Sequence, residues 1–245
     1  MVKTVLIQLP GGVQFPPHFP ASTLMESVIH EVFSGPEYPR ISFLDTRGSA
    51  IVDIGVNIRC SALLFATHYP DATVYALEPA TETFGFLSRN MASHRNVRPL
   101  HLGAYNADTT ARFFPGKAAS VTGSLVSGGE AADVPGETVR LRRISTLLRE
   151  LHLDRIALLK VDTEGAELGI LTDLVDFFDR IDAIYLEYHS EADRLAIDQL
   201  LSSQYTLISA RSNCPHRGIC GYCAKRVLSA KTNYELTAIR PPVIE

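Results

Sequence analysis

The chain has 245 residues, of which 46% are hydrophobic, and this is enough apolar surface for one large α/β domain or two small ones. Lysine and arginine (23) are outnumbered by aspartate and glutamate (27), and the net charge of −4 argues against a nucleic-acid partner. No apolar run reaches the ~18 residues that span a membrane, and the N-terminus lacks a signal-peptide cleavage site. We therefore expect a cytoplasmic protein with no membrane partner.

The N-terminal region reads as an appendage to the main domain. Residues 1–20 are rich in proline and indicate an irregular arm. Thr23 and Glu26 form a capping-box pattern, and apolar residues then recur with helical spacing from Leu24 to Phe33. We expect residues 1–35 to form an arm and a helix, and residues 36–245 to form the main domain.

From residue 50 onward, short apolar runs alternate with helical patterns. The predicted strands are 51–54, 72–77, 97–102, 156–161, 183–187, 205–210 and 234–239, and the predicted helices are 60–69, 81–91, 144–151, 166–178 and 191–201. Strands separated by such helices pair in parallel through right-handed crossovers. The last two strands have only a Cys/Gly-rich loop between them, so we expect them to pair antiparallel. The Gly-rich segment 115–137 predicts a surface loop, and the densest basic run, Arg140, Arg142 and Arg143, predicts a solvated strand edge.

Polar groups at the ends of the first two strands point to an adenosine-containing ligand. Asp53, Gly55 and Asn57 follow the first strand, where a glycine lets the backbone turn sharply and approach a ligand. Glu78 ends the next strand, 23 positions after Gly55, which suits an acid that accepts hydrogen bonds from ribose hydroxyls. NAD and S-adenosylmethionine sites share this logic. The dinucleotide fingerprint G-x-G-x-x-G is absent, however, and this disfavours NAD.

The sequence resembles the FkbM-type S-adenosylmethionine-dependent methyltransferases. The resemblance covers about residues 25–210, and four stretches carry it: residues 52–58 (VDIGVNI), 75–79 (YALEP), 159–167 (LKVDTEGAE) and 186–189 (LEYH). It implies an α/β, Rossmann-like class I methyltransferase fold whose seven-stranded sheet is mostly parallel with one antiparallel strand. It also implies O-methylation of sugars or secondary metabolites.

The resemblance implies that the cofactor S-adenosylmethionine binds at the ends of the strands. The expected cofactor-binding residues are Asp53, Gly55, Asn57, Glu78 and Asp162. Two features depart from the family pattern. Arg59 replaces a usual second glycine, where it can crowd the methionine moiety of the cofactor or pair with its carboxylate. The Cys-rich segment near residue 220 is not part of the pattern.

The reacting groups are expected after the fourth and fifth strands of the domain. O-methylation needs a base or a metal, because an alcohol is a weak nucleophile at neutral pH. We expect His189 to be the general base, oriented by Glu187 or Asp162. Alternatively Asp162, Glu164, Glu187 and His189 hold a divalent cation such as Mg²⁺.

Two local readings of the same stretch stay open. Glu164 and Glu167 have a purely structural alternative, in which they cap the following helix. Lys160 is either a local counter-ion or a solvated charge at the end of its strand.

The segment from Cys214 to Cys223 offers four soft or borderline metal ligands within ten positions. Cys220 and Cys223 form one CxxC knuckle, and Cys214 with His216 would complete a zinc site. A second CxxC knuckle is lacking, so zinc is not favoured. We expect free thiols in a loop that faces the substrate.

These observations favour an O-methyltransferase that acts on a hydroxyl of a small metabolite, sugar or secondary-metabolite intermediate. The arm, the loop at 115–137 and the Cys segment are expected to form the acceptor pocket. Two alternatives remain: a non-catalytic binding module that keeps the fold, which Arg59 allows, and an NAD-dependent oxidoreductase.

Overall fold

The computed structural model describes residues 37–56, 61–114 and 136–230, together with the backbone of five short strands outside these ranges. The predicted helix over Leu24 to Phe33, the residues Asn57, Arg59 and Cys60, and most of the Gly-rich segment lie outside the described residues.

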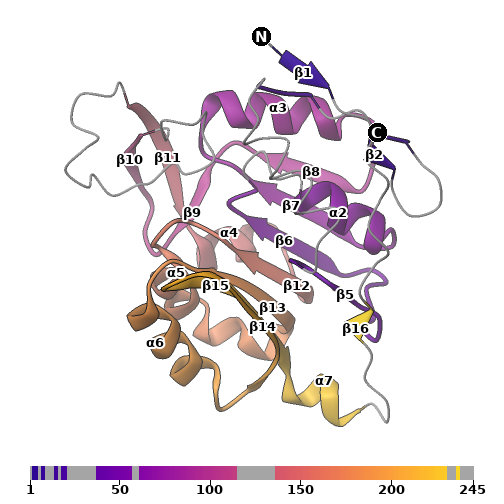
Figure 1. Ribbon diagram of the computed structural model, residues 1–245, viewed down its shortest axis with the longest axis vertical. Helices are drawn as coiled ribbons and strands as arrows, with labels where there is room; N and C mark the ends of the chain where they lie inside the picture. Colours follow the sequence, from indigo (N-terminus) through magenta and orange to yellow (C-terminus); the bar gives the residue numbers. More distant parts are fainter. Residues whose placement is uncertain are drawn as a thin grey trace.

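A seven-stranded sheet forms the centre of the molecule (Figure 1). Its strand order is β14-β15-β13-β12-β6-β7-β8. All neighbours pair in parallel except β13 with β15 and β14 with β15, so β15 is the single antiparallel strand of this sheet. This order and this one reversal are the Rossmann-like class I methyltransferase arrangement that the resemblance implied. The strands are β6 (Ala50–Ile54), β7 (Thr73–Leu77), β8 (Val97–Leu100), β12 (Ile156–Val161), β13 (Ile181–Tyr188), β14 (Tyr205–Cys214) and β15 (Arg217–Ala224).

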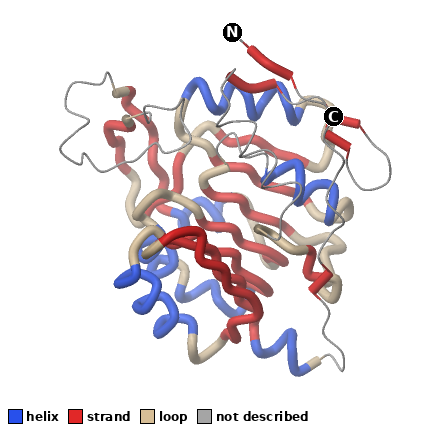
Figure 2. Tube along the Cα trace, viewed as in Figure 1, coloured by secondary structure: helices blue, strands red, loops and turns tan. Residues whose placement is uncertain are grey.

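Helices cover both faces of the sheet (Figure 2). Ile51 and Tyr185 belong to one apolar cluster, with the helices α2 and α3. Val52 and Ile184 belong to a second cluster on the opposite face, with α4, α5, η1 and α6. Since β12 and β13 are buried on both faces, their sequences are nearly continuous apolar runs. The helices are α2 (Ser61–His68), α3 (Thr81–Met91), α4 (Ile144–Glu150), α5 (Glu167–Asp173), α6 (Glu191–Leu201), α7 (Lys225–Ser229) and the 3-10 helix η1 (Val175–Arg180).

A second sheet, which the sequence analysis did not predict, stands beside the carboxyl ends of the central strands. It consists of β9 (Gly103–Tyr105), β10 (Thr109–Phe113) and β11 (Glu137–Arg143), in the order β10-β11-β9. The basic run lies in β11. Two of its arginines are ion-paired, Arg142 with Asp108 and Glu150, and Arg143 with Asp173. Much of the charge of this run is therefore matched by acids of the chain itself.

Three predictions about connectivity are wrong. The strand predicted at 205–210 pairs with β15, which is made from the segment predicted as a Cys/Gly-rich loop. The strand predicted at 234–239 is β16 (Leu236–Thr237), which pairs with β5 (Arg40–Ile41) in a separate two-stranded sheet. The single helix predicted at 166–178 is divided into α5 and η1.

The N-terminal arm is also less irregular than predicted. It contains the antiparallel pairs β1 (Val2–Thr4) with β4 (His18–Pro20), and β2 (Ile7–Gln8) with β3 (Gln14–Phe15). In the part of the chain that the structure describes, no helix is long and apolar enough to cross a membrane.

Candidate functional site

The turn after β6 is held against the end of β12 by direct backbone contact. Gly55 has a φ of +73°, and a Cβ placed on it would lie 1.7 Å from the carbonyl oxygen of Asp162. No residue with a side chain fits there, because non-bonded heavy atoms do not approach so closely and positive φ disfavours L-residues. The glycine thus permits the close backbone contact between the turn after β6 and the end of β12, at the expected cofactor end of the sheet.

The buried side chain of Lys160 holds this turn in place by a hydrogen bond. Lys160 is fully buried, and its Nζ donates a hydrogen bond to the carbonyl oxygen of Gly55 at 2.6 Å. The same Nζ lies 3.4 Å from Asp53 Oδ1 and 3.3 Å from Asp162 Oδ2. Asp53 also accepts a hydrogen bond from Ser61 at the start of α2. Of the two readings of Lys160, the structure supports the counter-ion.

Asp53 is fully buried, and its polar contacts are with Lys160 and Ser61. Burial raises the pKa of Asp53, although Lys160 and Ser61 favour its charged form. Its observed contacts therefore organise the turn from inside the protein, whereas the sequence analysis expected it to face the cofactor.

Glu78 lies where the sequence analysis expects a ribose-binding acid, at the carboxyl end of β7. It is buried, and its Oε1 accepts a hydrogen bond from the backbone N–H of Ala80 at 2.8 Å. This hydrogen bond orients the carboxylate at the start of α3. A buried acid one strand away from the Gly55 turn fits the donor pattern of a ribose.

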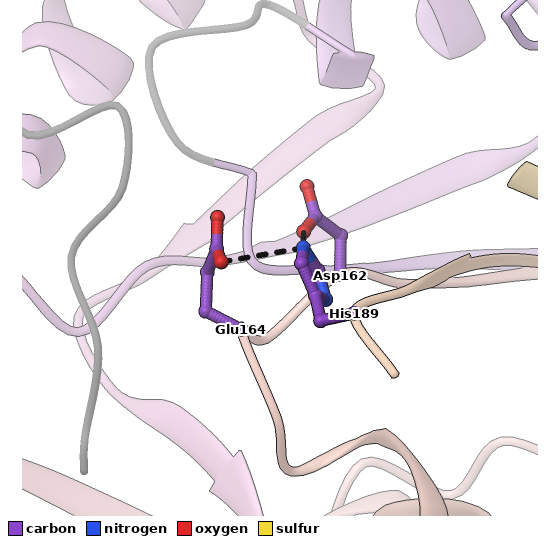
Figure 3. A group of neighbouring side chains, drawn as sticks. All are labelled: Asp162, Glu164 and His189. Carbon is purple, nitrogen blue, oxygen red and sulfur yellow. Dashed lines mark ion pairs between the residues drawn. The ribbon is translucent and has the colours of Figure 1, made fainter. Parts of the chain in front are cut away.

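Four carboxylates surround His189 at the carboxyl ends of β12 and β13, and Figure 3 shows two of them, Asp162 and Glu164. The Nε2 atom of His189 lies 3.3 Å from Glu164 Oε2, 3.8 Å from Asp162 Oδ1 and 3.9 Å from Glu187 Oε1. Its Nδ1 atom lies 3.0 Å from Glu167 Oε1. The structure therefore brings together all four residues that the sequence analysis placed at the reacting end, and it adds Glu167.

A strained turn presents Glu164 to this cluster. Glu164 has a φ of +54° and is followed by Gly165 with a φ of +116°. A non-glycine residue at positive φ is uncommon and costs about 1 kcal/mol or more, so the surroundings must stabilise it. Glu167 does so, because its carboxylate accepts hydrogen bonds from the N–H groups of Thr163 and Gly165 at 2.9 to 3.1 Å. Glu167 thus ties the turn to the imidazole, whereas Glu164 contacts His189 and Arg217.

The charges of the cluster raise the pKa of His189. Burial alone lowers this pKa, but the hydrogen bond with Glu167 and the charges of Glu164 and Asp162 outweigh it and raise the value to about 9. The partner Glu167 has its pKa lowered, since its hydrogen bonds with His189 and Gly165 outweigh its burial. At neutral pH His189 carries a proton in this state. The predicted general-base role requires that proton to leave first.

The predicted zinc ligands do not come together. Cys220 and Cys223 lie within β15 and pair with Leu186 and Ala183 of β13, so they form no chelating turn. Cys220 faces the cluster of α4 and α6, whereas Cys223, three positions on, faces the other side of the sheet. Cys214 and His216 lie at the hairpin turn between β14 and β15, about 20 Å from Cys223 at ~3.3 Å per residue. The prediction of free thiols is confirmed for these three cysteines, but not their place in a loop.

A cavity of about 220 Å³ adjoins the cluster through Glu164. It lies between the second sheet and the turn after β12. Its walls are Tyr105, Thr109, Ala111, Leu141, Thr163, Glu164, Gly165 and Ala166.

The sequence analysis did not place Glu167 among the residues of the site, and it left the role of Lys160 open. Glu167 was read as a helix cap, and its contact with His189, 22 positions away, has no local signal. For Lys160, the signal was a charged residue inside an otherwise apolar strand, and burial at that place requires a partner.

The comparisons with known proteins agree with this geometry. The family described as the methyltransferase FkbM domain matches residues 53–207, more than half of the chain. Methyltransferase 1 of Beauveria bassiana is 33% identical over 207 residues, a match that covers 76% of this chain and 82% of that protein. The 31-O-demethyl-FK506 methyltransferase FkbM of Streptomyces tacrolimicus is 28% identical over 188 residues, covering 65% of this chain and 72% of that protein.

Solved structures are more distant. An rRNA methylase from Streptococcus thermophilus aligns with a TM-score of 0.46 and 11% identity, over 82% of this chain and 94% of that one. Such a likeness carries no argument about the acceptor. The sequence match, the strand order and the cofactor turn support S-adenosylmethionine-dependent methyl transfer. The chain belongs to the FkbM methyltransferase family.

Proposed function

We propose that this protein transfers a methyl group from S-adenosylmethionine to a hydroxyl oxygen of a small hydroxylated metabolite, such as a sugar or a secondary-metabolite intermediate. The observation that carries the proposal is the position of the His189 cluster. Asp162 belongs to this cluster, and its backbone also touches the cofactor turn at Gly55. A hydroxyl bound at the cluster is therefore close to the cofactor end of the sheet.

The cofactor, when bound, supplies a sulfonium methyl group; the S–CH₃ bond breaks as the O–CH₃ bond forms, which leaves S-adenosylhomocysteine. The residues of this chain bind and orient the two reactants. Gly55 and Glu78 hold the adenosyl part, and Lys160 keeps the turn in place. Asp162, Glu187 and His189 hold the acceptor hydroxyl, and His189 receives its proton after giving up the one that it carries at neutral pH.

The names of two kinds of relative support an oxygen acceptor. The FkbM relative is described as acting on a 31-O-demethyl compound, and a hexuronic acid methyltransferase of Haloferax volcanii is also similar to this chain. The cavity beside Glu164 supports a small acceptor, since 220 Å³ is below the usual size of a pocket for a drug-like molecule. Its wall combines hydroxyl groups with apolar side chains, and this combination suits a partly apolar alcohol.

The first test is a calorimetric titration with S-adenosylmethionine, S-adenosylhomocysteine and NAD. We expect micromolar binding of both adenosyl ligands and none of NAD. Glu78→Gln should weaken their binding about 10-fold or more, as expected for the loss of a hydrogen bond to a charged group. Glu82→Gln is the matched control, because Glu82 is exposed on α3. Failure of both adenosyl ligands to bind the wild-type protein would overturn the proposal.

The second test separates O- from N-methylation. The protein is incubated with methyl-labelled S-adenosylmethionine and pairs of acceptors that differ only in a hydroxyl or an amino group, and products are identified by mass spectrometry. Labelled methyl ethers support the proposal, and labelled methylamines alone contradict it. The Asp162→Asn variant should abolish the product while the control Glu82→Gln retains it.

A further inference from the structure

Three potential metal ligands converge at the centre of the cluster. One donor atom each from Asp162, Glu164 and His189 lies within 4.8 Å of the other two (Figure 3). Two donors in neighbouring positions of an octahedral cation with bonds of about 2.1 Å lie about 3 Å apart. The separations of 3.3 Å and 3.8 Å from Nε2 to the two carboxylates are close to this value.

The imidazole nitrogen that points into this group has no hydrogen bond. The His189 side chain is 93% buried, since only 7% of it is exposed, and Nε2 has no hydrogen-bond partner among the described residues. A buried nitrogen without a hydrogen bond is costly, and native structures rarely keep one without a reason. A bound cation would replace the proton on this ring and satisfy the nitrogen atom.

The opposite edge of the ring is arranged as in metal-binding histidines. Such a histidine almost always gives its second ring N–H to a carboxylate or a carbonyl, which fixes the ring and the coordinating nitrogen. Here Nδ1 lies 3.0 Å from Glu167 Oε1, and Glu167 is held in turn by the N–H groups of Thr163 and Gly165. Glu187, with Oε1 3.9 Å from Nε2, is a further oxygen donor within reach.

We propose that Asp162, Glu164 and His189 bind one divalent first-row transition cation, with Mn²⁺ as its representative. The mixed donor set decides the class of ion. Carboxylates suit Mg²⁺, Ca²⁺ and Mn²⁺, but the imidazole nitrogen disfavours the first two, which prefer oxygen. We therefore expect Mg²⁺, the cation considered in the sequence analysis, to bind this site more weakly than Mn²⁺.

The role of the cation rests on the proposed function, but its binding does not. A cation here would act as a Lewis acid on the acceptor hydroxyl and lower the pKa of that hydroxyl. Asp162, Glu164 and His189 would then be ligands, and Glu187 would receive the proton of the hydroxyl. Binding itself is a property of the free protein and is measured without cofactor or acceptor.

The experiment is a calorimetric titration of the metal-free protein with Mn²⁺ and with Mg²⁺, followed by pulsed electron paramagnetic resonance of the Mn²⁺ complex. We expect one Mn²⁺ per chain, binding at least 10-fold tighter than Mg²⁺. Glu164→Gln and His189→Gln should each weaken Mn²⁺ binding at least 10-fold, because even the partners of metal ligands typically contribute 10- to 100-fold. Glu191→Gln is the matched control, since Glu191 pairs with Arg194 outside the cluster.

The resonance spectrum gives a test that needs no variant. A nitrogen coupling on bound Mn²⁺ is expected from the His189 ring, and it should vanish in His189→Gln. Absence of saturable Mn²⁺ binding, absence of the nitrogen coupling, or unchanged affinity in Glu164→Gln would each overturn the inference. If Mn²⁺ binds as expected but no acceptor is methylated, the proposed function fails and the cation site stands. If methyl transfer proceeds and Mn²⁺ does not bind, the reverse holds.

Discussion

Replacing Gly55 by alanine should disrupt both the stability of the protein and its cofactor site. Two costs add at this position. A residue with a Cβ in the left-handed region costs about 1–2 kcal/mol. The new methyl group, placed 1.7 Å from the carbonyl oxygen of Asp162, must also push β6 and β12 apart, and overpacking of this kind costs about 1–3 kcal/mol or more. The expected loss is about 2–5 kcal/mol, a large part of the ~5–15 kcal/mol that stabilises a typical domain.

Gly48 offers a matched control for the first cost alone. It has a φ of +63°, but a Cβ placed on it would have no atom within 4 Å. Urea unfolding followed by circular dichroism should show a loss of about 1–2 kcal/mol for Gly48→Ala, against about 2–5 kcal/mol for Gly55→Ala. S-adenosylhomocysteine should bind Gly48→Ala normally and Gly55→Ala not at all. Equal losses of stability in the two variants, or unimpaired binding by Gly55→Ala, would refute the reasoning.

Three further predictions concern regions outside the site. Burial lowers the pKa of His68 to about 4, so the unfolded chain takes up a proton between pH 6.5 and 4 that the native protein does not. Stability should fall by about 3 kcal/mol as the pH falls through that window, and urea titrations should show a smaller fall in His68→Gln. Of Cys214, Cys220 and Cys223, only the first is exposed, so a thiol reagent should label Cys214 and neither Cys220 nor Cys223 in the native protein, as peptide mass mapping would reveal. Tyr205→Phe removes a hydroxyl that contacts the carbonyl oxygens of Phe178 and Ile181, but these keep the N–H of Ile181 and the guanidinium of Arg226 as donors, so the loss should be about 0.5–1.5 kcal/mol in urea unfolding.

The central strands were predictable because strands that are buried on both faces have nearly continuous apolar sequences. The strand at Ile156–Val161 has the predicted bounds, since a strand covered on both faces must be apolar almost throughout. Lys160 is the exception within it, and its two carboxylate partners come from β6 and from the end of β12 itself. Lys160, a charged residue in an otherwise apolar strand, therefore indicated the position of the site.

The strand β15 could not be predicted in the same way. Its glycines and cysteines are typical of a loop by composition, but the structure gives Gly221 a packing role. A Cβ on Gly221 would lie 2.9 Å from the ring of Tyr185 on the neighbouring strand β13. Only the tertiary contact between the two strands makes glycine the suitable residue there. The partnership of Glu167 with His189 is likewise a property of the fold and not of any local spacing.

The contact between Lys160 and the Gly55 turn also sets the order in which the protein acquires its binding capacity. The two hydrogen bonds from Nζ to the turn join residues 105 and 106 positions apart in the chain. Contacts between such distant residues form late in folding, because closing a long loop costs entropy before the contacts contribute favourable energy. During synthesis, the segment from β6 to β8 emerges from the ribosome well before β12. In a growing chain, therefore, the cofactor turn lacks its contact with Lys160 until β12 has paired with β6, and cofactor binding is expected only after this pairing.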